Sequence, residues 1–532
     1  MNMQQGFSLH SPQTNMELVF SRLQWLILLP LVFLFILLSY LYTILWLRPE
    51  RLRQKLRSQG VKGPKPSFLF GNIAEMRRIQ KELAISVQEL QAGTTEKFSS
   101  DYTATLFPYF LHWSRIYGSI FLYSTGSIQI LNMTDPDMVK ELANCKSFDI
   151  GRPLSLQKER GALLGMGILA SNGELWAHQR KVIAPEFFMD KVKGMLHVMV
   201  EAAMPMLTSW ENITAETVVD ESLRNFSAEV ISRTSFGSNL AAGKEIFNKI
   251  RQLQIAMAEQ SMLGVPGIRY LPTKTNREIW SLDRSIRRLI LNVALKHEQD
   301  SDALSTKDLL HSIIKGAKAR HFASQTPEDF IIDNCKNIYF AGHETTSTTA
   351  AWCLMLLASH PEWQSRARTE LLDVCQGKPI EFDMLRKLKM ITMVIQETLR
   401  LYPPAAFVAR EALNDLKIGS LNIPKGTNIR IPVALAHRDP VVWGPNSDRF
   451  DPGRFANGIA GACKAPHMYM PFGVGARTCA GQNLAMVELK VVLSLVLSKF
   501  EFALSPKYVH CPAFRLTIEP GNGVPLILKK LY

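Results

Sequence analysis

An uncharged stretch of 25 residues near the start of the chain limits what this sequence can fold into more than any other feature. It runs from Leu23 to Leu47. A helix of about 20 apolar residues is long enough to cross the hydrocarbon core of a bilayer. The apolar part of a cleaved signal peptide has only about 7–15 residues, and a small-residue cleavage pattern follows it. No such pattern follows this stretch. It therefore predicts an uncleaved transmembrane anchor.

The charges on either side of the anchor predict its orientation. Five Lys and Arg residues follow it within residues 48–57, whereas Arg22 is the only one before it. Because positive charge stays on the cytoplasmic side, we expect the body of the protein in the cytosol. Pro64 and Pro66 favour a stiff, extended connector. The expected organisation is a short lumenal N-terminus (1–22), the anchor (23–47), a basic and proline-rich hinge (48–72) and one body (73–532).

The composition describes a globular protein and excludes two classes of site. Hydrophobic residues make up 47% and charged residues 20% of the 532-residue chain. The seven cysteines are scattered, odd in number and contain no C-x-x-C pair. This argues against a disulfide framework or a zinc site, and for reducing surroundings. The net charge of +14 predicts an acidic partner or an anionic membrane surface.

One glycine-rich stretch matches a nucleotide-binding pattern, but its flanks exclude that interpretation. Gly165 to Ala170 fits G-x-G-x-x-[G/A]. No strand pattern precedes it, and we expect a turn after it rather than the required helix. The sequence also lacks a P-loop, so electrons for any redox chemistry must come from another protein. The body is predicted to be mostly helical, with strands at 119–124 and 428–436.

The stretch PFGVGARTCAG, Pro471 to Gly481, surrounds Cys479 with residues that a buried structural cysteine does not need. A thiolate is a strong iron ligand, but its charge needs hydrogen bonds. Gly473 and Gly475 can take positive φ, so the loop can aim backbone N–H groups at the sulfur. Phe472 can cover the sulfur and exclude water.

The residues after the cysteine are suited to a flat cofactor. Gly481 lets the following apolar helix, Gln482 to Phe500, approach such a cofactor closely. Arg477 can reach outward to a carboxylate. A flat macrocycle with an axial metal and anionic side groups meets all of these conditions, and haem is that cofactor. The alternative is a buried free cysteine in a glycine-rich turn.

This loop resembles the haem-binding loop of the cytochrome P-450 superfamily. The resemblance covers essentially the whole chain and implies the P-450 fold, which is mainly α with small β-sheets (α+β). It implies a single haem-thiolate catalytic domain, 73–532, behind one N-terminal transmembrane helix, with haem b bound by the Cys479 thiolate. The matching residues of the loop are Phe472, Gly475, Arg477, Cys479 and Gly481. The other matching stretches, in the family's order, are AGHETTSTT (Ala341–Thr349), ETLR (Glu397–Arg400) and FDPGRF (Phe450–Phe455).

The first of these stretches lies in a predicted long helix. Thr326 and Pro327 form a capping start, and Pro361 ends the apolar run. Thr345 stands four residues after Ala341, so its hydroxyl can bond that carbonyl and open a groove. By resemblance, Thr345 and Glu344 deliver the protons that split bound oxygen. The alternative is that a threonine in a buried helix only back-bonds and packs.

Two sets of arginines are expected to support the haem. Glu397 and Arg400 can pair on one helical face, and the resemblance adds Arg454 to a buried, structural triad. Haem propionates also need cations. His437 is a further candidate for such a contact, although a packed core histidine is the simpler interpretation. Arg152 stands near a position where many relatives carry a further basic residue. The residues that match the family's propionate contacts are Trp176, Arg180, Arg410 and Arg477.

Three functions are compatible with these residues. The first is a monooxygenase that takes electrons from NADPH through a separate flavin enzyme, NADPH–cytochrome P-450 reductase, docked near Cys479. The second is a haem-thiolate isomerase or dehydratase, and the third a non-catalytic haem or lipid-binding protein. The intact acid–threonine pair favours the first. We expect membrane lipid, the reductase and a small apolar substrate as partners, and no nucleic acid. The expected location is the endoplasmic reticulum membrane.

The substrate is predicted from a second resemblance. Residues 261–280, the expected roof of the cavity, and residues 333–346 resemble the plant branch that contains gibberellin and related diterpenoid oxidases. A rigid tetracyclic acid would then be hydroxylated or epoxidised. Arg160, Arg269 and Lys274 are candidates for holding its carboxylate, although a solvated surface charge is the simpler interpretation of each.

Overall fold

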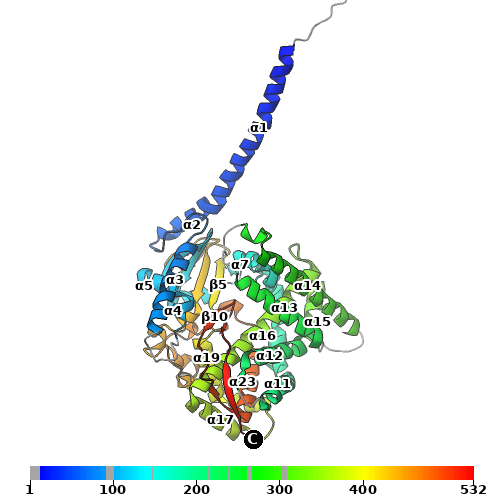
Figure 1. The fold of residues 1–532 in the computed structure, drawn as a ribbon, viewed down its shortest axis with the longest axis vertical. Helices are drawn as coiled ribbons and strands as arrows, with labels where there is room; N and C mark the ends of the chain where they lie inside the picture. Colours follow the sequence, from blue (N-terminus) through cyan, green and yellow to red (C-terminus); the bar gives the residue numbers. More distant parts are fainter. Residues whose placement is uncertain are drawn as a thin grey trace, which may run out of the picture.

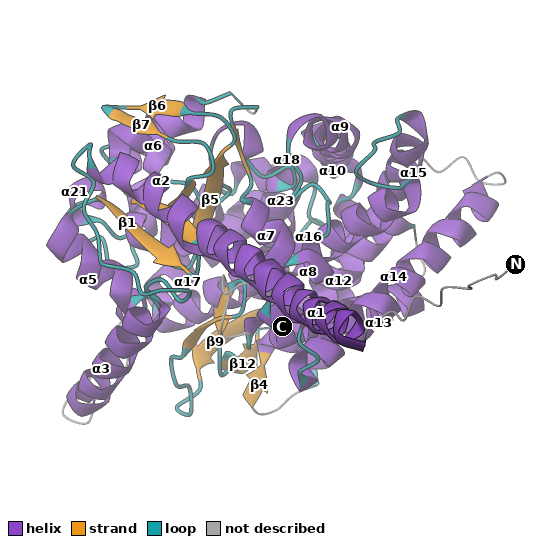
Figure 2. Ribbon diagram, turned by 90° about the horizontal axis from the view of Figure 1, so that it is seen from above, coloured by secondary structure: helices purple, strands orange, loops and turns teal. Residues whose placement is uncertain are grey.

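The computed structural model describes residues 12–91, 101–146, 148–212, 216–237, 240–259, 267–301 and 308–531. Helices make up most of the body, and the strands gather in small sheets at its margins (Figure 2). The longer helices are α1 (Pro12–Tyr42), α2 (Arg48–Arg57), α3 (Ile73–Gln91), α5 (Pro108–Tyr117), α6 (Pro136–Asn144), α9 (Gly173–Ile183), α11 (Leu196–Glu211), α12 (Val219–Phe236), α13 (Leu240–Ala258), α14 (Lys274–Ser301), α15 (Leu309–Ala319), α16 (Pro327–Ser359), α17 (Pro361–Cys375), α19 (Lys389–Leu401) and α23 (Gln482–Lys499).

The largest sheet has five strands in the order β1-β2-β8-β5-β3. Only the β2–β8 pair is parallel. A second sheet has the order β4-β12-β9, and two hairpins, β6-β7 and β10-β11, complete the set. The strands are β1 (Ile120–Thr125), β2 (Ile128–Met133), β3 (Ile150–Gly151), β4 (Glu216–Val218), β5 (Phe407–Ala412), β6 (Leu416–Ile418), β7 (Leu421–Ile423), β8 (Asn428–Pro432), β9 (Phe500–Leu504), β10 (Pro512–Phe514), β11 (Ile518–Pro520) and β12 (Pro525–Lys530).

The N-terminal helix stands away from the body. Figure 1 shows α1 projecting from the end of the body opposite the C-terminus, with no other element beside it. The helix from Trp25 to Arg57 is the one element of the described chain that is long and apolar enough to cross a membrane. Helix α1 itself begins at Pro12, inside the segment expected to be a lumenal tail, and residues 1–11 lie outside the described chain.

The hinge is partly helical rather than extended throughout. The α1 helix continues through a π-helical turn, Thr43–Leu47, into α2, and only residues 61–66 have no regular secondary structure. The ring of Trp46 lies 5.5 Å from that of Phe68, and the guanidinium of Arg53 lies 5.4 Å from the Trp46 ring centroid. These contacts pack the base of the anchor against the connector.

Helix α16 runs through the centre of the body and packs against α12, α14, α15, α19 and α23. It has the predicted start, because the Thr326 hydroxyl accepts a hydrogen bond from the Asp329 amide and Pro327 occupies the first turn. It ends at Ser359, before Pro361. One strand prediction was too long. β8 ends at Pro432, and Val433–Ala436 form the short helix α20.

The stretch from Gly165 to Ala170 packs against α16 and does not form the turn of a dinucleotide-binding site. The short helix α8 (Gly161–Leu164) precedes it where a dinucleotide site needs a strand, whereas helix α9 does begin at Gly173, where we expected a turn. A Cβ on Gly165 would lie 2.1 Å from the Asp333 side chain. The amides of Met166 and Leu169 donate to Asp333 and Asn337 at 2.8 and 2.9 Å. The glycines therefore allow a close approach to the central helix.

Candidate active site

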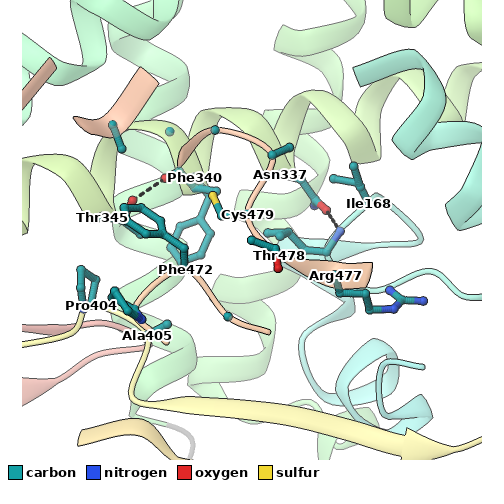
Figure 3. A pocket seen from close by; sticks show the side chains of 18 of the residues that line it. Ile168, Asn337, Phe340, Thr345, Pro404, Ala405, Phe472, Arg477, Thr478 and Cys479 are labelled. Atoms are coloured by element: carbon teal, nitrogen blue, oxygen red, sulfur yellow. Dashed lines mark hydrogen bonds between the residues drawn. The ribbon is translucent and has the colours of Figure 1, made fainter. Parts of the chain in front are cut away.

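A cavity of about 330 Å³ lies between α16 and the loop that carries Cys479. Its walls come from α9, α16, the segment between α19 and β5, the cysteine loop and the start of α23. In Figure 3, the sulfur of Cys479 and the side chain of Thr345 face this space, with the ring of Phe472 near the sulfur. Eight of the ten predicted site residues line the cavity: Trp176, Arg180, Thr345, Arg410, Phe472, Arg477, Cys479 and Gly481.

The cysteine loop has the backbone that its glycines predicted. Gly473 and Gly475 have φ of 79° and 69°, and the Cys479 amide donates to the Phe472 carbonyl at 2.9 Å. Gly475 does not line the cavity. A Cβ there would lie 2.5 Å from the Ala143 carbonyl oxygen, so this glycine lets the loop pack against α6. Nothing lies within 4 Å of a Cβ built on Gly481, which leaves open space beside the sulfur.

The thiol of Cys479 is accessible from the cavity although protein surrounds the loop. Burial raises the pKa of this thiol, while the Gly481 backbone amide and the charge of Arg180 act in the opposite direction. Both groups stabilise a negative sulfur. An iron ion on the cavity side would supply the remaining positive charge that a thiolate ligand needs.

Four arginines, Arg152, Arg180, Arg410 and Arg477, line the cavity, and no Asp or Glu of the described chain does. Burial and the charges of Arg152 and Arg477 hold the pKa of Arg410 well below its ordinary value. Among the described residues, the buried Nε atoms of Arg152 and Arg477 find no hydrogen-bond partner. Such a cluster requires an anion. The two carboxylates of haem fit it, so the residues present suit that cofactor.

The same arginines also clamp the cysteine loop. Arg180 donates to the Thr478 carbonyl at 2.7 Å, and Arg410 to the Val474 carbonyl at 3.0 Å. The guanidinium of Arg477 lies 4.3 Å from the centroid of the Trp176 ring and bonds the Asn172 side chain at 2.8 Å. Sequence spacing gave no sign of the loop contacts, because their partners are backbone carbonyls.

Thr345 makes the hydrogen bond that its position on α16 predicted. Its hydroxyl donates to the Ala341 carbonyl at 2.8 Å, and its own carbonyl accepts from the Thr349 hydroxyl at 2.8 Å. Because the Ala341 carbonyl takes this bond, the helix surface here presents a threonine hydroxyl to the cavity (Figure 3).

Glu344 points away from the cavity, although it is the neighbour of Thr345. It is fully buried and does not line the cavity. Its Oε1 accepts from Arg251 at 2.9 Å and lies 3.7 Å from Nε of Arg224. Arg251 also bonds Glu519, on β11, at 2.8 Å. The four side chains form one ion cluster, which we call the Glu344 cluster.

The pKa values of the two carboxyl groups in the Glu344 cluster are shifted in opposite directions. Burial raises the pKa of Glu344 even though Arg224 and Arg251 oppose it. Burial acts in the same direction on Glu519, but hydrogen bonds from Arg251 and Arg515 and the charges of Arg251 and Arg224 outweigh it and lower the pKa of Glu519. Glu344 is therefore the carboxyl of this cluster that takes up a proton more readily. Residue 519 lies too far along the chain for any spacing rule to have found it.

The Glu397–Arg400–Arg454 cluster supports the site from behind. Arg400 donates to both carboxylate oxygens of Glu397, at 2.7 and 2.8 Å, and Arg454 lies 3.7 Å from Glu397. Arg400 also donates to the His437 carbonyl at 2.8 Å. Nε2 of His437 accepts from the amide of Met470, just before the cysteine loop, at 2.9 Å. His437 is a packed core residue, and burial beside Arg400 lowers its pKa to about 3.

None of the three candidate cations for a substrate carboxylate lines the cavity. Arg160 donates to the Met257 carbonyl at 2.6 Å, and Arg269 stacks on Tyr270 at 4.5 Å. Lys274 is exposed at the start of α14. Residues 261–266 of the expected roof lie outside the described chain, and residues 267–280 are not part of the cavity wall. The described structure therefore gives no support for these three cations as substrate contacts.

Comparison with known proteins agrees with this geometry. The chain is 76% identical to cytochrome P450 714C2 of Oryza sativa subsp. japonica, over 97% of this chain and all of the relative. It is 46% identical to cytochrome P450 714B3 of Zea mays, over 92% of this chain and 93% of the relative. Identity to cytochrome P450 714A2 of Arabidopsis thaliana is 43%, over 89% and 92%. The sequence profile of cytochrome P450 matches residues 93–522. The cysteine loop, the arginine-lined cavity and these matches together show that the chain belongs to the cytochrome P450 family of monooxygenases.

Proposed function

We propose that this protein is a haem-thiolate monooxygenase that inserts one oxygen atom from O2 into a gibberellin or a related diterpenoid acid. Its electrons come from NADPH through the separate flavin reductase, which docks on the face near Cys479. The single observation that carries the proposal is the cavity. There an accessible cysteine sulfur, four arginines and a threonine hydroxyl of the central helix line one space, and no Asp or Glu of the described residues lines it with them.

The residues that would hold haem are those that fit it chemically. Cys479 would supply the thiolate ligand, and Arg180, Arg410 and Arg477 would pair with the propionates, with Arg152 as a fourth cation. Haem bound in this way supplies the activation of dioxygen. Phe472 covers the sulfur side and limits access of water to it.

The chain's own part in the reaction is to position the substrate and move protons. The hydroxyl of Thr345 can turn from the Ala341 carbonyl toward an oxygen atom in the cavity and donate its proton there. Glu344 then restores that proton, which requires its carboxyl to leave Arg251 or to act through water. The ion cluster therefore controls when Glu344 can act.

The cavity wall favours a rigid apolar substrate. The side chains away from the arginines are mainly aliphatic and aromatic, and they include Ile338, Phe340, Phe407 and Leu516. Such a wall binds a fused-ring hydrocarbon by excluding water. The apolar helix α1 supports attachment of the body to a membrane, where a lipid-soluble substrate concentrates. We assign the body to the cytosolic side of the endoplasmic reticulum.

The test uses the full-length chain with the reductase in microsomes. NADPH and a panel of gibberellins and kaurenoic acid are supplied, and products are identified by mass spectrometry. We expect a product 16 mass units heavier than one of these acids, and no product with Cys479→Ala. If the diterpenoids return unchanged while another lipid gains oxygen, the substrate assignment is wrong and the monooxygenase assignment stands.

Consumption of NADPH separates the other two functions. An isomerase or dehydratase converts a hydroperoxide without NADPH, and a binding protein converts nothing. Substrate-dependent NADPH consumption that requires the reductase is expected here. Conversion of a lipid hydroperoxide in the absence of both would contradict the proposal.

A further inference from the structure

A column of aromatic rings leads from the central helix toward the surface behind the cavity. The rings of Trp352 on α16 and Tyr402 at the end of α19 stack with centroids 4.2 Å apart. Tyr102 stacks on the other side of Tyr402 at 5.2 Å. His510 meets the same pair edge-on, 5.7 Å from Trp352 and 5.8 Å from Tyr402. We call Trp352, Tyr402, His510 and Tyr508 the aromatic relay.

The relay begins immediately behind the cavity wall. The indole N–H of Trp352 donates to the Ile518 carbonyl at 3.0 Å, and Thr517 beside it lines the cavity. Pro404, two residues after Tyr402, lines the same wall, and its carbonyl accepts from the Ile518 amide at 3.1 Å. Along α16, seven residues separate Thr345 from Trp352, which is about 10 Å at the helical rise. Trp352 is fully buried.

Hydrogen bonds continue the relay from Tyr402 to the surface. The Tyr402 hydroxyl and Nε2 of His510 are 3.1 Å apart, and Nδ1 of His510 is 2.8 Å from the Tyr508 hydroxyl. Burial, with the charge of Arg438, lowers the pKa of His510 to about 4, so the ring is neutral near pH 7. A neutral imidazole has one N–H and one lone pair. It can therefore accept a proton from one phenol while donating to the other. Tyr508 is partly exposed.

We propose that the aromatic relay carries one-electron oxidation from the cavity to a small-molecule thiol, such as glutathione, at the protein surface. This transfer protects the cofactor from oxidation. The proposal rests on haem binding at Cys479. Stacked indole and phenol rings are the side chains most readily oxidised by one electron, and a phenol loses that electron easily only when a base takes its proton. The relay supplies both features in one connected set.

The steps balance in electrons and protons. An oxidant in the cavity, such as peroxide at the haem, takes one electron from Trp352, which recovers it from Tyr402 while the phenol proton moves to Nε2 of His510. Tyr402 then takes an electron from Tyr508 and its proton back from His510, and Tyr508 releases its own proton to water. A thiol gives the Tyr508 phenoxyl one hydrogen atom. Two such passages reduce one peroxide by two electrons and leave one disulfide.

The test locates the residue on which a radical forms after the protein is treated with an oxidant. Haem-loaded full-length protein, without reductase or substrate, is treated with hydrogen peroxide and a nitroso spin trap. The trap adduct is located by peptide mass spectrometry, and the haem absorbance is followed over time. We expect the adduct on Tyr508. With Tyr402→Phe the adduct at Tyr508 is lost and haem bleaches several-fold faster. Glutathione added to the wild type prevents the adduct and prolongs the haem absorbance.

Tyr339→Phe is the matched control. Tyr339 is also buried on α16, and its ring stacks on Phe236 at 4.0 Å, outside the relay. This variant should match the wild type in both measurements. Tyr508→Phe, changed at a partly exposed site, should fold normally, lose the adduct and bleach quickly.

Two results would overturn the proposal. One is a wild-type protein with no adduct on Tyr508. The other is equal labelling of Tyr508 in the wild type and in Tyr402→Phe. A protein without haem absorbance at the start would contradict the proposed function itself, which distinguishes the two failures.

Discussion

At the scale of single residues, Thr345 and Glu344 are adjacent in the sequence but have different surroundings. Successive residues of an α-helix point about 100° apart, so the pair cannot face one cavity together. The structure gives the cavity to Thr345 and the ion cluster to Glu344. In the proposed reaction, Arg251 and Arg224 therefore hold the carboxyl of Glu344 away from the cavity until it donates its proton.

Thr345→Ala tests the hydroxyl. Without it, protons reach bound oxygen through less ordered water, and electrons are lost to peroxide. A positioned proton donor typically contributes roughly 10²–10⁴-fold to a rate, and water in the cavity replaces part of that contribution. We therefore expect the yield of product per NADPH to fall several-fold or more, while haem content stays normal. Thr345→Ser keeps the hydroxyl and should retain most of the yield. Equal yields from the Ala variant and the wild type would contradict the role.

Glu519→Gln tests the Glu344 cluster from its far side. Removing the charge of Glu519 leaves Glu344 as the one carboxylate of the cluster that pairs with Arg251 and Arg224. The two arginines then bind Glu344 more firmly. We expect the turnover number to fall several-fold with little change in KM, and a larger solvent deuterium isotope effect on product formation. Glu501→Gln, at an exposed carboxylate that pairs with Lys529, is the control. An unchanged isotope effect would show that Glu519 is only structural.

At the scale of elements, sequence patterns predicted helix α16 and the cysteine loop well, because local rules determine both. A capping threonine, a proline in the first turn and glycines with positive φ act within a few residues. The strand expected at 428–436 was half wrong. After Pro432 the chain leaves the sheet and turns as a short helix whose Val433 and Ala434 are buried, and apolar residues alone do not distinguish the two.

The parts that sequence could not predict are tertiary. The Glu344 cluster joins α12, α13, α16 and β11. The unpartnered Nε of Arg152 appears only once the loops are folded. The three candidate cations for a substrate carboxylate do not line the cavity, and the sequence around a charged residue does not show in which direction its side chain points.

His437 links α19 to the cysteine loop through hydrogen bonds, and we expect this link to make the free energy of unfolding depend on pH. His437 accepts from Met470 through Nε2 and must stay neutral to do so. Its pKa is lowered to about 3 in the folded chain and is about 6.5 when unfolded. At a pH between these two pKa values, the unfolded state binds a proton at His437 and the folded state does not. The free energy of unfolding therefore falls as the pH falls. By pH 5 the loss from this residue is roughly 2 kcal/mol.

Unfolding by urea at pH 7.5 and pH 5 measures this effect. The wild type should lose more stability across the interval than His437→Gln. The Gln amide oxygen can accept from Met470, and the side chain does not titrate in this range. Identical losses in both proteins would show that other groups, such as the buried His343, dominate the acid response.

At the scale of the whole molecule, helix α1 projects from the body that carries the cavity. The side chains of α1 from Trp25 to Tyr42 are exposed and α1 stands clear of the body (Figure 1), whereas the base of the anchor packs on Phe68. Removing residues 1–47 should therefore leave a folded, haem-binding body. We expect alkaline carbonate to release this shortened protein from membranes but not the full chain. A shortened protein that resists carbonate would place another membrane-embedded segment in the body.

The central claim is that the sulfur of Cys479 holds the iron of haem. Its most direct test is the absorbance of the reduced, carbon monoxide-bound protein, compared between the wild type and Cys479→Ser. The wild type should show the red-shifted Soret band of a thiolate-ligated haem, and the variant should lose that band. A wild-type spectrum without it, or a variant that keeps it, would contradict the account.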